Sequence, residues 1–212
     1  MEIDVRRQLD AVGRVVSAGE RDGEPVHTVA LSRSYDTTLD DLWDAVTRSG
    51  RIERWFLPVD GELTAGGRYR IEGNASGTIT ECEPGSRFAL TWEFGESVSW
   101  VGVRLSAEGD GRTRLALEHT EPLSEHWAEY GPGAVGVGWE LALLGLALHL
   151  EQPAGPRLDE AAFGISPKGT ALIAGSSGAW AQAAIAAGTE PEQARAAAAR
   201  TTAFYTGDAA AG

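Results

Sequence analysis

Cysteine is almost absent from this sequence, since Cys82 is the only one among 212 residues. One thiol can form neither an intramolecular disulfide nor a cysteine-based metal cluster. A chain without disulfides fits a reducing compartment, and the N-terminal segment MEIDVRRQLD lacks the continuous apolar stretch of a signal peptide. We therefore expect a cytoplasmic protein.

Basic residues are also scarce: Lys and Arg total 18 against 31 Asp and Glu, which gives a formal net charge of -13. The arginines are scattered among acidic residues and form no basic run. A surface of this charge repels phosphate backbones and anionic lipids. We expect no nucleic-acid partner and no membrane partner.

Long apolar runs are limited to one segment, VGVGWELALLGLALHL at residues 135–150. It is about 16 residues long, which is shorter than the roughly 20 that a membrane span requires. It also contains Glu140 and His149. The segment therefore predicts a buried helix.

Before the sheet proper, the sequence predicts an N-terminal arm with a short helix through Leu9 and a strand around Val15, closed by a turn at Asp22-Gly23. A strand follows over residues 25–36. Thr38 begins a helix that ends at Gly50, and a second, short helix is expected over residues 51–56.

After Gly66 the apolar residues recur with a period of two, in short runs separated by Gly, Pro or Asp-Gly. These runs predict consecutive antiparallel strands near residues 68–73, 77–82, 87–94, 101–105 and 115–119. Alanine dominates the end of the chain, where helices are expected over residues 168–187 and 192–205.

The expected fold is α+β: a sheet of about six strands, with a helical pair near its start and a long helix laid across one concave face, which leaves a hollow. Because the helix over residues 135–150 is apolar almost all round, it must be covered on both sides. The sheet covers one side. The other is covered either by the alanine-rich helices or by a second subunit in a homodimer.

Ordered motifs between residues 29 and 150 carry a resemblance; they read SRSYDTTLDDLWDAVTRSGRIERWFLP, LTAGGRYRIEG, GTITECEPGSRFALTWEFG, TRLALEHT and GVGWELALLGLALHL. This stretch resembles the SRPBCC (START-like) superfamily and, within it, the branch of activator of heat-shock-protein-90 ATPase homologues. The resemblance implies a helix-grip, Bet v 1-like fold: a curved antiparallel sheet wrapped around a long C-terminal helix, with a hydrophobic cavity between them.

The resemblance also divides the chain. Residues 1–23 form the N-terminal arm, residues 24–152 the helix-grip SRPBCC domain, and residues 153–212 an extra alanine-rich helical tail.

Large apolar side chains are candidates for ligand binding, because a ligand pocket is mostly apolar with a few placed polar groups. With seven tryptophans in the chain, some indole rings are expected to line the hollow, although the same rings could fill an ordinary core. The candidate ligand-binding residues are Trp55, Phe56, Tyr69, Trp92, Trp100, His119, Trp139 and Leu143.

No catalytic residue, metal site or cofactor is predicted. His119 shares a strand face with Leu115 and Leu117, so it can be a base in the hollow or, more simply, a hydrogen-bonded core histidine. The histidines form no H-x-x-x-H pair, and no serine lies in a G-x-S-x-G elbow. The acids Glu118, Glu121 and Glu140 are expected to face solvent.

We therefore expect a non-enzymatic binding module that holds a small apolar or aromatic ligand between the sheet and the long helix. Two alternatives stay open. One is a polyketide cyclase or dehydratase-like enzyme with His119 as its general base. The other is an interaction protein that stimulates a chaperone ATPase, whose partner would be a chaperone or another protein.

Overall fold

The computed structural model describes residues 3–207 and divides into two compact units. Unit 1 comprises Met1–Leu31, Leu123–Leu141 and Leu158–Gly212, and unit 2 comprises Ser32–Pro122 and Ala142–Arg157. The boundaries between these units differ from those of the predicted arm, domain and tail. Strand β2 (Glu24–Tyr35) and helix α5 (Gly133–Glu151) each run from one unit into the other.

The predicted α+β architecture with a curved antiparallel sheet is confirmed, with eight strands in the order β1-β2-β8-β7-β6-β5-β4-β3. The expected number of strands was too low for two reasons. The arm supplies a full strand, β1, and a three-residue strand, β3, is too short for a periodic signal. The strands not yet delimited are β1 (Val12–Arg21), β3 (Val59–Gly61), β4 (Arg68–Ile71), β5 (Ser76–Glu83), β6 (Arg87–Phe94), β7 (Ser97–Gly109) and β8 (Arg112–Pro122).

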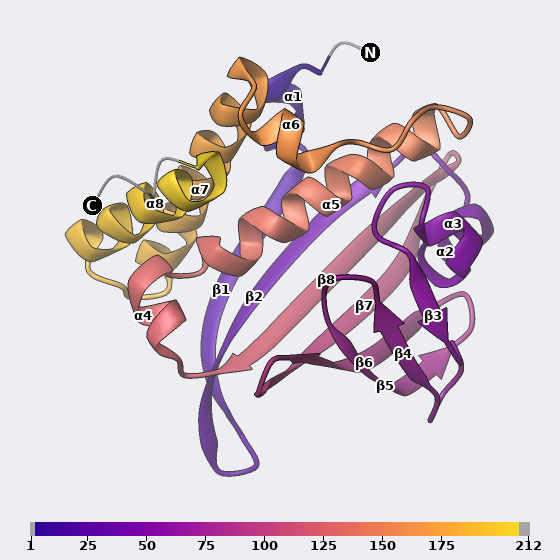
Figure 1. Ribbon diagram of the computed structural model, residues 1–212, viewed down its shortest axis with the longest axis horizontal. Helices are drawn as coiled ribbons and strands as arrows, with labels where there is room; N and C mark the ends of the chain where they lie inside the picture. The colour runs from indigo at the N-terminus through magenta and orange to yellow at the C-terminus, as the bar shows by residue number, and fades with distance from the viewer. Residues whose placement is uncertain (1–2, 208–212) are drawn as a thin grey trace. The chain divides into compact units, whose positions relative to one another are not determined.

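In unit 2, the helical pair that precedes the main strands is α2 (Leu39–Thr47) and α3 (Ser49–Ile52), which lie beside each other in Figure 1. The Thr38 hydroxyl caps α2 by accepting a hydrogen bond from the amide of Asp41, as its sequence predicts. Helix α3 starts earlier and ends earlier than expected, because its hydrogen bonds pass into turns after Ile52.

The second half of α5, from Ala142 onward, belongs to the core of unit 2. The Tyr35 hydroxyl on β2 donates a hydrogen bond to the carbonyl oxygen of Leu143 at 3.3 Å. The backbone at Trp55 passes so close to Gly145 that a Cβ there would meet the Trp55 carbonyl oxygen. A glycine at this point therefore lets α5 approach the segment that follows α3.

In unit 1, the alanine-rich end of the chain folds into α7 (Pro167–Ala186) and α8 (Pro191–Thr206), which run side by side in Figure 1. Both helices match the predicted ranges closely. The short helices α1 (Val5–Asp10), α4 (Glu125–Tyr130) and α6 (Glu160–Gly164) complete the unit. Of these, α4 and α6 were not predicted, because one or two turns are too short to show a helical period.

The first half of α5 is covered by α7 and α8, which confirms the first of the two arrangements expected for this helix. The indole of Trp180 packs directly on Gly136, and the Tyr205 hydroxyl donates a hydrogen bond to the Ala134 carbonyl oxygen at 2.7 Å. A homodimer stays a prediction.

Helix α5 is long and apolar enough to cross a membrane by those two criteria alone, and it is the one such helix among residues 3–207. However, 72% of its most apolar window is buried inside the protein. This is the behaviour of a core helix, as the embedded Glu140 and His149 predicted.

Candidate functional site

One face of strands β6, β7 and β8 in unit 2 gathers the predicted polar and aromatic site residues. Trp92 on β6 lies directly opposite Ser99 on β7, and Val101 on β7 lies opposite His119 on β8. Opposed residues of antiparallel strands share a face, as do residues two apart on one strand. We call the face that carries Trp92, Ser99, Val101 and His119 the inner face.

The inner face is not buried evenly. On β7 and β8 most of its side chains are buried, including Val101, Val103 and Leu117. On β6 the corresponding side chains, Leu90 and Trp92, are only half-buried, although β6 lies between two other strands. Apolar surface in the middle of a sheet therefore remains within reach of solvent or of a ligand.

His119 and Ser99 form a buried hydrogen-bonded pair on this face, with 2.8 Å between His119 Nε2 and Ser99 Oγ. The Ser99 hydroxyl donates to the carbonyl oxygen of Trp92 at 3.2 Å. A hydroxyl has one hydrogen, so we assign the hydrogen between the pair to Nε2 of His119, which donates to Ser99. The prediction of a hydrogen-bonded core histidine is confirmed.

The protonation state of His119 follows from its surroundings. Burial lowers the pKa of the imidazole from its ordinary value of 6.5 to about 4, so the ring is neutral at neutral pH. With the hydrogen assigned to Nε2, the ring does not draw a proton from that serine. The pair can orient a polar group of a ligand, but it is not an activated nucleophile.

Glu121 is a polar residue of the inner face whose environment differs from the one expected for it. It lies two residues beyond His119 on β8, and therefore on the same face. It is half-buried, and burial raises the pKa of its carboxyl group from 4.5 to about 7. The expectation that Glu121 faces solvent is wrong. Extending the alternation of Leu115, Leu117 and His119 by one step would have found it.

The other predicted residues of unit 2 surround this face with mixed roles. Trp55 is buried and its indole donates to the Ala45 carbonyl oxygen at 2.9 Å, so it belongs to the core. Phe56 is half-buried and packs, with Trp92, against the core cluster that contains Tyr69. Leu143 is buried on α5.

Tyr69 is held by structural contacts. It lies opposite Gly77 on β5, and its hydroxyl donates to the carbonyl oxygen of Thr91 on β6 at 2.7 Å. A Cβ on Gly77 would collide with the same Thr91 carbonyl. The Tyr69 ring therefore covers a position where no side chain fits, and it supports the inner face from one edge.

One predicted residue of unit 2 is not on the inner face. Trp100 follows Ser99 on β7 and lies opposite Thr91 and Thr120, so it occupies the other face of the sheet. That position contradicts the expectation that Trp100 lines the same hollow as Trp92. Trp139 lies on the first half of α5 and belongs to unit 1.

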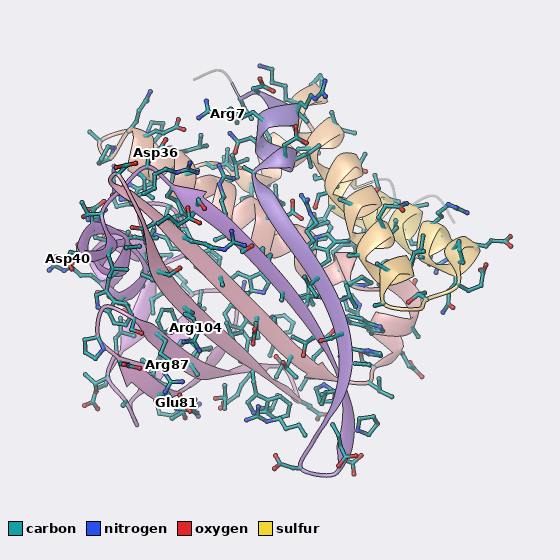
Figure 2. The ribbon with its side chains drawn as sticks, turned by 180° about the vertical axis from the view of Figure 1, so that it is seen from behind. Arg7, Asp36, Asp40, Glu81, Arg87 and Arg104 are labelled. Atoms are coloured by element: carbon teal, nitrogen blue, oxygen red, sulfur yellow. The ribbon has the colours of Figure 1, made fainter. Side chains whose placement is uncertain are left out.

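The outer face of unit 2 carries charges that are paired or exposed. Figure 2 shows Glu81, Arg87 and Arg104 projecting from neighbouring strands on this side. Arg87 pairs with Glu81 at 3.5 Å, and Glu93 accepts two hydrogen bonds from Arg68, which holds the pKa of that carboxyl below its usual range.

Glu140 also departs from the expectation of a solvent-facing acid. It lies in unit 1, where the guanidinium of Arg14 donates two hydrogen bonds of 2.6 Å to its carboxylate. The Glu140 side chain is 5% exposed. Across residues 3–207, no three His, Cys, Asp or Glu side chains gather as metal ligands.

Comparisons with known proteins agree with the geometry. The model of the family described as "Activator of Hsp90 ATPase homolog 1-like protein" matches residues 36–151, more than half of the chain. The crystal structure of CalU16 from Micromonospora echinospora is 33% identical, covers 82% of this chain and 98% of its own, and superposes with a TM-score of 0.67. A search of curated proteins found no match.

More distant solved structures share the fold alone. An HSP90 activator from Plasmodium falciparum is 21% identical over 58% of this chain and 96% of its own, with a TM-score of 0.52. DynU16, a protein in the dynemicin biosynthetic locus, is 22% identical over 59% of this chain and 48% of its own, with a TM-score of 0.54.

Proposed function

This chain belongs to the family of activator of Hsp90 ATPase homolog 1-like proteins, and from that premise we propose that it is a non-enzymatic module that binds a small apolar or aromatic molecule on its inner face. The observation that carries the proposal is the uneven burial of that face. Leu90 and Trp92 stay half-buried at the centre of the sheet, while their neighbours on β7 and β8 are buried.

An aromatic ligand suits this surface for a physical reason. Covering apolar area stabilises a complex by roughly 25 cal/mol per Å², and stacked or edge-on rings add to that value. The Trp92 ring already lies 6.0 Å from the His119 ring, at an angle of 57°. A flat ligand lying on Trp92 would also meet the polar edge formed by His119 and Ser99, which would fix its orientation.

The proposed role does not use His119 as a general base. A general base in a hydrolase or cyclase needs a pKa near the working pH, whereas burial lowers that of His119 to about 4. Its Nε2 lies 2.8 Å from Ser99 Oγ, and Ser99 donates to a backbone carbonyl. These contacts support a positioning role for the pair.

Binding of the neutral dye Nile red, followed by fluorescence titration, tests the proposal with a matched pair of variants. Trp92→Ala removes a ring from the inner face, and Trp100→Ala removes an equally half-buried ring from the other face. We expect saturable binding that Trp92→Ala weakens about tenfold and Trp100→Ala leaves nearly unchanged. Equal effects of both variants, or no saturable binding, would contradict the proposal.

A second candidate is stimulation of a chaperone ATPase. The family description favours it, and one protein of the same fold is an HSP90 activator. Ligand binding depends on the inner face, whereas stimulation of the ATPase does not require it. Addition of the purified chain to an Hsp90-type chaperone would raise its ATPase rate under this alternative, and the Trp92→Ala variant would raise it equally.

We further propose that the protein acts in the cytoplasm, with the small molecule as its principal partner and a second copy of the chain as a candidate subunit. Native mass spectrometry of freshly purified protein tests for the small molecule and for the second copy in one measurement. A retained small molecule would appear as added mass, and a homodimer as twice the mass of one chain.

A further inference from the structure

Glu121 occupies a defined place in the inner face. Thr120 on β8 lies opposite Trp100 on β7, so the next residue, Glu121, comes level with Ser99. Ser99 in turn lies opposite Trp92 on β6. Neighbouring strands are about 4.8 Å apart, so the backbones at Trp92 and Glu121 are about 10 Å apart across one row of the face. This span matches a bicyclic aromatic ring with a short substituent.

The Glu121 carboxyl group has no hydrogen-bond or ion-pair partner within the described part of the chain, residues 3–207. Carboxylates withdrawn from water are normally paired, because an isolated charge is costly to bury. In unit 1 the protein supplies such a partner to Glu140. Glu121 is half-buried and has no such partner, so a positive group from outside the chain would find its carboxylate free to pair.

No cation of unit 2 faces Glu121. The inner-face residues of β6 and β7 around it, such as Leu90, Trp92 and Ser99, do not titrate. On β8 the nearest titratable group is His119, which is neutral at neutral pH. Within unit 2, β2 carries Arg33, which does not contribute to the pKa of Glu121; burial alone raises that pKa to about 7.

Aromatic rings lie at the same end of the face. Trp92 is half-buried and Phe94, two residues farther on β6, is 61% exposed. The π face of an aromatic ring attracts cations, and tryptophan does so most strongly. A carboxylate without a counter-charge beside such rings is a chemistry that recognises an organic ammonium group.

We propose that the ligand of the inner face is an aromatic molecule that bears a protonated amine, with its ring on Trp92 and its ammonium group paired with the Glu121 carboxylate. This inference rests on the proposed binding function and specifies its ligand class. It gives Glu121 the counter-charge that the described chain does not provide.

A proton balance distinguishes this pairing from a simple hydrogen bond. An ammonium group stabilises the ionised carboxylate, so binding lowers the pKa of Glu121 and releases a proton near neutral pH. A ligand carbonyl that accepted a hydrogen bond from the protonated carboxyl would raise that pKa and take a proton up. The sign of proton exchange therefore reports which ligand chemistry the site prefers.

The test uses two probes of equal shape, naphthylmethylamine and naphthylmethanol, in calorimetric titrations of the full chain. Only the first carries a positive charge. We expect the amine to bind at least about tenfold more tightly than the alcohol at about pH 8. Its affinity should fall about tenfold toward about pH 6, as Glu121 takes up a proton.

Glu121→Gln should abolish the preference for the amine and leave the affinity for the alcohol unchanged. Glu118→Gln is the matched control, because Glu118 is an exposed acid of the same strand on the other face. Equal affinity for both probes, or a preference that survives in Glu121→Gln, would overturn the amine inference while the binding function stands. No binding of either probe would overturn both.

Discussion

Glu140 in unit 1 is buried and Glu121 in unit 2 is half-buried, yet only Glu140 has a cation beside it within residues 3–207. Arg14 reaches Glu140 through two hydrogen bonds of 2.6 Å and also donates to the carbonyl oxygens of Leu9 and Val12. The Glu140 carboxylate and the Arg14 guanidinium therefore both have hydrogen-bond partners inside unit 1. The contacts of Glu121, by contrast, are incomplete.

The difference separates structural from functional burial of charge. A buried pair that is closed within the protein ties β1 to α5 and leaves nothing for a partner to bind. A half-buried carboxyl group without a partner costs free energy in the isolated protein, and such costs are retained where a ligand offsets them. Four variants test these features of the two units.

The largest effect is expected from Glu140→Gln. The change leaves the Arg14 guanidinium buried without its counter-charge, which typically costs about 3–5 kcal/mol. Urea denaturation, followed by circular dichroism, measures the free energy of unfolding. If the loss is below about 1 kcal/mol, Glu140 and Arg14 are not the closed pair described here.

A double change refines this first prediction. Arg14→Met combined with Glu140→Leu removes both charges and fills their space with apolar atoms, which is often neutral or stabilising. We expect the double variant to recover most of the stability that Glu140→Gln loses. Failure to recover would indicate that the hydrogen bonds of Arg14 to Leu9 and Val12 matter more than the charge pair.

A smaller effect is expected from Gly136→Ala, which probes the close packing of unit 1. The added methyl group would overlap the fully buried indole of Trp180, so we expect a loss of about 2–3 kcal/mol. Gly178→Ala on α7 is the control, because a Cβ there meets nothing within 4 Å. It should stabilise the protein by about 0.5–1 kcal/mol through helix propensity.

The smallest effect is expected from Glu121→Gln in the protein without ligand, and its sign is opposite. The folded protein keeps the Glu121 proton up to about pH 7, whereas the unfolded chain loses it near the ordinary value of 4.5. Stability is therefore lost as the pH rises from about 4.5 to about 7. The glutamine variant should be about 1–2 kcal/mol more stable than the parent at about pH 8.

The same variant should differ little from the parent at about pH 5, where the carboxyl group is protonated in the folded state. Denaturation curves at the two pH values give the comparison. A constant difference at both values would show that the carboxyl group is hydrated and not dry.

Local signals in the sequence predicted most of the fold. The strict alternation in RFALTWEF matches β6 residue for residue, and Thr38 caps α2 with its own side chain. The Asp22-Gly23 turn is also confirmed, with positive φ at both residues. Each of these features depends on neighbours in the chain, which is why the sequence alone could predict them.

The site was less predictable, because its properties depend on residues far apart in sequence. The partner of Glu140 is Arg14, 126 positions away in the sequence. No pattern of neighbouring residues predicts a pair that far apart. The face occupied by Trp100 depends on the register of β6 with β7. His119 was assigned correctly as a hydrogen-bonded core residue, but its partner Ser99 could be identified only once that register was known.

The lone thiol of Cys82 has a practical consequence for all of these measurements. It is exposed on β5 and lies opposite Phe88, on the same side of the sheet as Leu90 and Trp92. A thiol-reactive fluorophore would label each chain once, with no engineered cysteine. Energy transfer from the tryptophans to such a label would then report, in real time, when a molecule enters or leaves, and the Trp92→Ala variant would show which part of the signal comes from Trp92.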